Sequence, residues 1–107
     1  MDSNILTALR PKAMTALRTV TDDIGLLTEI DSILEAGYRD LEATAGIDMT
    51  NFYKDGEFDP LILRALLTYT RLEFGEPSNY DQLWKSYWNQ KAQLQTCRGY
   101  GLKKEAE

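Results

Sequence analysis

Histidine is absent from this chain of 107 residues, and cysteine occurs once, at Cys97. Without histidine, the chain lacks the usual proton shuttle near neutral pH and the commonest nitrogen ligand of metals. A single cysteine excludes an internal disulfide framework, a multi-thiolate zinc site and a Cys–His nucleophile pair. No D-x-D pair or EF-hand-like cluster indicates a magnesium or calcium site. We therefore expect that the protein is not an enzyme and that it uses no cofactor or metal.

The chain also lacks a long uncharged apolar stretch, because Arg64 and Arg71 bracket its most apolar run. A membrane-spanning helix and a membrane partner are therefore not expected. The first residues do not contain a basic region followed by an apolar block, so no signal peptide is expected either. A lone cysteine fits a reducing cytoplasm.

Basic residues are outnumbered by acidic ones, which gives a net charge of −5. Residues 22–59 carry a net charge of −9, whereas residues 1–21 and residues 60–107 each carry +2. This balance argues against general nucleic-acid binding, which depends on Lys and Arg to neutralise phosphates. The acidic segment is either an ordinary solvated helix face or a surface selected for a partner or for repelling DNA.

Hydrophobic periodicity predicts an all-α fold, a compact bundle of about four helices in residues 1–97. A long loop at residues 47–58 separates the second helix from the third, and residues 98–107 are expected to form a flexible tail. In the first helix, Pro11 either takes the first helical position or breaks a longer helix that includes Leu6 and Leu9.

The second helix is expected to be capped by Thr21 or Asp22 and to end at Gly46. Gly25 and Gly37 within it suggest the close approach of a neighbouring helix. The apolar residues of this segment recur at steps of three and four and predict one buried stripe. They are Ile24, Leu27, Ile30, Leu34, Tyr38, Leu41 and Ala45.

Asp55-Gly56 marks a turn in the long loop, where a small hairpin or an ordered loop would fit. The flanking aromatic residues Phe52, Tyr53 and Phe58 either fold back onto the core or form a contact surface. Both interpretations stay open from the sequence.

The third helix has both a start and a stop signal, with the pair Asp59-Pro60 before it and Gly75 after it. Its interior is apolar on nearly every side, which predicts a central helix packed on more than one face. Arg64 and Arg71 are seven residues apart and share a face. They form either a solvated edge or a salt-bridged seat at a subunit boundary.

The fourth helix carries an aromatic stripe, which is usually part of a core, although Trp84 and Trp88 are wide enough for one to reach a partner. The stripe consists of Tyr80, Leu83, Trp84, Tyr87, Trp88, Lys91 and Leu94.

The order of these features resembles the small head–tail connector proteins of long-tailed bacteriophages, also called head-completion, adaptor or DNA-packaging proteins. The shared layout is a short helix, an acidic turn at residues 21–23 and a long helix that ends at Gly46. A D-P-L-I-x-R-A-x-x-T-Y-x-x-x-x-F-G helix follows at residues 59–75, and an L-x-x-S-Y-x-x-x-K-x-x-L helix at residues 83–94. The similarity covers about residues 11–97, whereas the long loop and the tail do not match.

The resemblance implies a structural virion protein at the head–tail neck, made in the bacterial host cytoplasm. Such subunits form a ring below the portal protein, expected to be dodecameric to match it. They extend the channel for duplex DNA without sequence recognition, and they join the head to a stopper or tail-completion protein. The candidate interface residues are Phe52, Tyr53, Phe58, Arg64, Arg71, Trp84, Trp88 and Tyr100.

The acidic residues of the second helix are candidates for the wall of the DNA channel, which should not grip the duplex. They are Asp22, Asp23, Glu29, Asp31 and Glu35. Two alternatives are a small helix-turn-helix DNA-binding regulator that uses Arg10, Lys12 and Arg18, and a generic helical interaction module.

Overall fold

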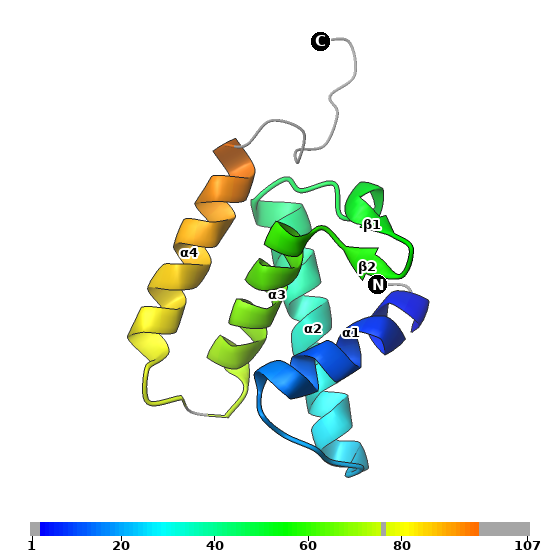
Figure 1. Cartoon of the computed structure of the whole chain (residues 1–107). Coiled ribbons are helices and arrows are strands. Elements are labelled where there is room, and N and C mark those ends of the chain that lie inside the picture. The colour runs from blue at the N-terminus through cyan, green and yellow to red at the C-terminus, as the bar shows by residue number, and fades with distance from the viewer. Residues whose placement is uncertain (1–2, 76, 97–107) are drawn as a thin grey trace.

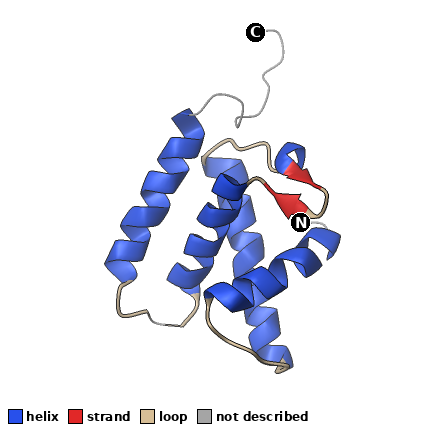
Figure 2. Cartoon of the chain, in the orientation of Figure 1, coloured by secondary structure: helices blue, strands red, loops and turns tan. Residues whose placement is uncertain are grey.

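The computed structural model describes residues 3–75 and 77–96, and this part of the chain contains four α-helices and one small β-hairpin (Figures 1 and 2). The expected all-α fold is confirmed, and the two strands are a minor addition. No helix in these two ranges is long and apolar enough to cross a membrane. In chain order the elements are α1 (Ser3–Ala16), α2 (Ile24–Thr44), a 3₁₀ turn (Thr50–Phe52), β1 (Tyr53–Lys54), β2 (Glu57–Phe58), α3 (Pro60–Glu73) and α4 (Tyr80–Thr96).

Helix α3 is the central element, because α1, α2 and α4 all pack against it (Figure 1). Its predicted limits are confirmed: the Asp59 carboxylate accepts a hydrogen bond from the Leu61 N–H at 3.1 Å, and Gly75 has a φ of 67°. Burial on several sides fits its apolar sequence. The buried residues of α3 are Ile62, Ala65, Leu66, Thr68, Thr70 and Leu72.

Helix α1 differs from the sequence expectation, because Pro11 lies inside a continuous helix that it neither starts nor breaks. Proline in a helix interior loses one hydrogen bond and costs roughly 3 kcal/mol. Ile5, Leu9 and Ala13 recur every four residues and are all buried. Their burial against α2 and α3 outweighs the local cost of the proline.

Helix α2 begins one or two residues later than expected, because its cap is Asp23 and not Asp22 or Thr21. The Asp23 carboxylate accepts a hydrogen bond from the Leu26 N–H at 3.0 Å, and the hydroxyl of Thr21 accepts one from the Asp23 N–H. The helix ends before Gly46, whose φ of 69° is the left-handed geometry that glycine tolerates.

The predicted apolar stripe of α2 is buried from Ile30 to Ala45, but Ile24 at its start is exposed. The close helix approach predicted at Gly37 is confirmed. A Cβ atom at residue 37 would lie 2.8 Å from Cδ1 of the Tyr69 ring on α3. The one predicted at Gly25 is wrong, because Gly25 is exposed and, among the described residues, a Cβ atom there would meet only the Asp23 carboxylate.

The long connection between α2 and α3 folds into the hairpin, with Asp55 and Gly56 both at positive φ in its turn. The aromatic side chains of this segment fold back: Phe58 is buried, and Phe52 and Tyr53 pack against the core while half-buried.

Candidate functional site

Helix α4 presents two different faces, so the predicted aromatic stripe is only partly core. Leu83, Tyr87 and Leu94 are buried against the bundle. Trp84 and Trp88 keep 38% and 48% of their surface exposed. Tyr80 continues this outer face, because residues 80, 84 and 88 are spaced by four and therefore lie on one side of a helix.

The exposed aromatic side chains are ordered by one another. The Trp84 and Trp88 rings are perpendicular, with centroids 5.6 Å apart. Trp84 also lies 6.2 Å from Tyr87 at an interplanar angle of 30°. Edge-to-face and stacked aromatic pairs are favourable beyond their buried area. The outer face of α4 is thus a preorganised aromatic surface.

A polar bridge joins α4 to α2 behind this surface. The hydroxyl of Tyr87 donates a short hydrogen bond to the Asp40 carboxylate. Nζ of Lys91 donates to the same oxygen of Asp40 at 3.2 Å and to Oγ1 of Thr44 at 2.9 Å. Gln95 adds a hydrogen bond to the Thr44 carbonyl at 3.2 Å. The side chains of Tyr87 and Lys91 on α4 and of Asp40 and Thr44 on α2 therefore satisfy one another's hydrogen-bonding groups.

Lys91 is well enclosed within the bridge, with its side chain only 6% exposed, against 28% for Asp40. Its ammonium group lies 4.3 Å from the centroid of the Trp88 ring, within the range of a cation–π interaction. One side chain thus connects the buried bridge to the exposed aromatic surface.

The bridge fixes the protonation states of the Asp40 carboxyl group and the Tyr87 hydroxyl group. Burial raises the pKa of Asp40, but the hydrogen bonds from Tyr87 and Lys91 and the positive charge of Lys91 outweigh it. The pKa therefore lies below its ordinary value. Burial raises the pKa of Tyr87, and its hydrogen bond to Asp40 raises it further. A charged carboxylate and a neutral phenol suit a fixed structural link.

The candidate channel residues on α2 divide into two groups. Asp22, Asp23, Glu29 and Glu35 are exposed. Asp31 is half-buried, and its two carboxylate oxygens accept hydrogen bonds from Arg10 at 2.8 and 2.7 Å. Asp31 therefore belongs to the contact between α1 and α2, and its charge is offset.

The basic residues of α1 form ion pairs with carboxylates, which weakens the DNA-binding alternative. Arg10 is paired with Asp31, and Lys12 lies 3.5 Å from the Glu57 carboxylate. Of the three basic residues that such a regulator would use, only Arg18 has no carboxylate partner among residues 3–75 and 77–96.

The two arginines of α3 are exposed, and neither guanidinium group pairs with a carboxylate within the described ranges. Of the other candidate interface residues, Phe58 contacts Tyr53 and Tyr38 and contributes to the core, and Tyr100 lies outside the described residues. Within the described ranges, no group of three Cys, Asp or Glu residues could hold a metal ion.

No protein-family model, curated protein or solved structure matches the chain.

Asp40 and Thr44 were not identified from the sequence as members of this site. They precede Lys91, which they bind, by 51 and 47 residues in the chain. A signal was present. Lys91 lies within an apolar stripe, and a buried lysine needs an anionic partner. Periodicity alone does not say which carboxylate that partner is.

Proposed function

We propose that this protein is a structural subunit of a bacteriophage neck, a head–tail connector that assembles as a ring below the portal. The observation that carries the proposal is the outer face of α4, where Trp84 and Trp88 are exposed but held in place. Helices α3 and α4 also carry the residue order that resembles the connector family, from residue 59 to residue 94.

The aromatic surface suits a protein partner. Trp and Tyr are enriched at the centres of protein interfaces, where a few buried aromatic anchors provide most of the binding energy. Trp84 and Trp88 are already ordered by each other and by Lys91, so docking costs little further side-chain entropy. A partner such as the portal, the stopper or a tail-completion protein would bury them.

The exposed carboxylates of α2 suit a channel wall that repels duplex DNA. Asp22, Asp23, Glu29 and Glu35 are available for this role, whereas Asp31 is neutralised by Arg10. A wall of one negative sign would let the duplex slide without sequence recognition. The proposed role is therefore mechanical, with no catalytic step and no cofactor.

Deleting the gene from the phage that encodes it tests this proposal. We expect DNA-filled heads that lack tails and lose infectivity, with rescue by the wild-type gene supplied in trans. Complete, infectious tailed particles from the deletion phage would overturn the assignment. Portal, protease and capsid genes next to the coding sequence are the expected genomic context.

A gel shift with duplex DNA at low salt provides the second test, because it separates a connector from a regulator. A connector with an acidic surface should not retard DNA of any sequence. Sequence-specific retardation would favour the helix-turn-helix alternative.

A further inference from the structure

An open groove of about 580 Å³ runs along the outer side of α3, between α1 and α4. Leu63, Leu67 and Leu83 give it an apolar lining. Three basic side chains also line it, namely Lys12, Arg64 and Arg71, together with one acidic side chain, Glu57. We call this surface the groove.

Two of the groove's cations and one of its acceptors have no partner among residues 3–75 and 77–96. Lys12 is paired with Glu57, but the Arg64 and Arg71 guanidinium groups pair with no carboxylate there. The side-chain oxygen of Gln90 is buried in the same lining and accepts no hydrogen bond from the described residues. The groove therefore favours an occupant that is apolar and acidic and that donates a hydrogen bond.

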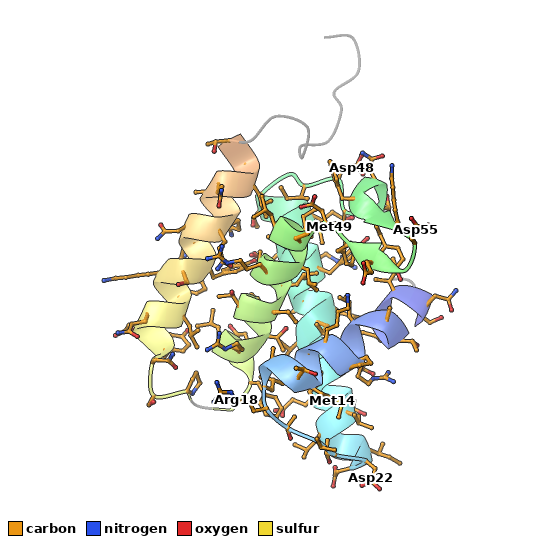
Figure 3. All side chains as sticks on the ribbon, viewed as in Figure 1. Met14, Arg18, Asp22, Asp48, Met49 and Asp55 are labelled. Atoms are coloured by element: carbon orange, nitrogen blue, oxygen red, sulfur yellow. The ribbon has the colours of Figure 1, made fainter. Side chains whose placement is uncertain are left out.

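The N-terminal end of α2 has the apolar and acidic character that this lining favours. It projects beyond the other helices (Figure 1), and Figure 3 places Asp22 at this free end. Val20 and Ile24 are 98% and 80% exposed there. Asp22 and Asp23 lie between them, and residues 20–26 contain these two acidic residues and no basic one. We call residues 20–26 the tip.

We propose that the tip of one subunit docks into the groove of a second copy of this chain. Val20 and Ile24 would cover the apolar lining, and Asp22 would meet Arg64 or Arg71. Large apolar side chains that are almost fully exposed gain most from such a contact. Opposite charges at the rim select this partner and this orientation.

The contact is heterologous, because the tip and the groove are different surfaces of the subunit. A subunit whose tip is docked still has a free groove, so further copies can be added until a ring closes. The inference thus deepens the proposed function and rests on it for its role in the virion. It also assigns Asp22 and Asp23 to the subunit interface, which leaves Glu29 and Glu35 to face the DNA.

Charge argues against two other occupants of the groove. The tail, residues 98–107, contains three basic and two acidic residues, so its net charge of +1 does not offer the negative charge that Arg64 and Arg71 favour. Duplex DNA would meet the two exposed arginines, but the chain as a whole carries a charge of −5.

A charge swap in the full-length protein tests the contact. The groove variant is Arg64→Glu with Arg71→Glu, and the tip variant is Asp22→Lys. All three residues are exposed. Each variant alone should associate at least about tenfold more weakly than wild type in sedimentation at low salt. A mixture of the two should regain association, because each acidic tip meets a basic groove and each basic tip an acidic groove.

The matched control is Arg39→Glu with Lys85→Glu, which makes the same charge change at exposed positions outside the groove. It should associate as wild type does. Wild type that stays monomeric up to about 1 mM would overturn the proposal. So would assembly that stops at dimers, an equal effect of the control, or duplex DNA binding that the groove variant abolishes.

The contact and the connector assignment can fail separately. Tailed, infectious particles from the deletion phage would reject the assignment whatever the sedimentation shows. Wild-type association of the groove variant and the tip variant would reject the contact even if the deletion phage produces tailless heads.

Discussion

Lys91 on α4 and Asp40 on α2 form an ion pair with Nζ and Oδ2 3.2 Å apart, although both helices pack chiefly on α3 and hardly on each other. The pair is therefore a direct link between two outer helices of the bundle. Because the Lys91 ammonium is buried, removal of its partner should be costly.

Asp40→Asn should lower the free energy of unfolding by about 2–4 kcal/mol, because it leaves a buried ammonium without a counter-ion. Lys91→Met should cost less, since the apolar side chain fills the same space and Tyr87 still binds the carboxylate. Urea denaturation of both single variants and of the Asp40→Asn, Lys91→Met double variant gives the interaction free energy between the two side chains. We expect it to be about 1–2 kcal/mol. Lys85→Met, exposed on the same helix, is the control and should change stability by less than about 0.5 kcal/mol. Additive effects of the two single changes would contradict the link.

The same pair predicts a sensitivity to acid. The pKa of Asp40 is lower in the folded protein than its ordinary value, so its stabilising contribution is present above that value, about 3.9. The contribution is lost as the pH falls through the ordinary pKa toward the folded one. We expect wild type to lose more thermal stability between about pH 5 and pH 3 than Asp40→Asn does. Glu35→Gln, at an exposed position of α2, should keep the wild-type profile. Parallel curves for wild type and Asp40→Asn would rule out this role.

Gly37→Ala should destabilise the protein even though alanine is the better helix former by roughly 1 kcal/mol. The added Cβ would lie 2.8 Å from Cδ1 and 3.2 Å from Cγ of the Tyr69 ring, so the half-buried ring, or α3 with it, must shift. We expect a net loss of about 1–2 kcal/mol in chemical denaturation. Ser32→Ala, at an exposed position of the same helix, should be neutral or slightly stabilising. A stabilised Gly37→Ala variant would show that the helices are not in close contact there.

Adjacent residues of α4 should respond very differently to truncation. Leu83 is buried, and Leu83→Ala should cost about 2–4 kcal/mol in thermal or urea unfolding. Trp84 is partly exposed, and Trp84→Ala should cost less than about 1 kcal/mol. Similar losses at both positions would mean that Trp84 is part of the core.

The only two tryptophans of the chain are on the outer face of α4, so tryptophan emission, excited selectively over that of tyrosine, reports on this face alone. Acrylamide should quench the emission of the free subunit efficiently, and assembly with a neck partner should protect it. Trp88→Phe and Trp84→Phe separate the two signals. Weak quenching of the free subunit would contradict an exposed aromatic surface.

The sequence correctly predicted the features that neighbouring residues determine, such as the limits of α3. Asp59-Pro60 and Gly75 define α3 because a cap, a fixed φ and a left-handed residue act within a few positions. Pro11 was misinterpreted because the burial of Ile5, Leu9 and Ala13 is a property of the whole bundle.

The candidate site was only partly predictable for the same reason. Trp84, Tyr87 and Trp88 share one helical periodicity, and only the position of α3 decides which of them is covered. The partners of Lys91 are about half the chain away in sequence, so no local pattern connects them.

The bridge from Asp40 also sets the register of α4 along the bundle. A slip by one helical turn moves side chains by about 5.4 Å and by four residues. It would place Tyr87 or Gln95 where Lys91 now meets the Asp40 carboxylate, and neither carries a positive charge. The apolar contacts of α4 alone would tolerate sliding far better than this pair does. One lysine thus fixes the height at which every subunit presents Trp84 and Trp88, and a ring of identical copies would display them at a single level.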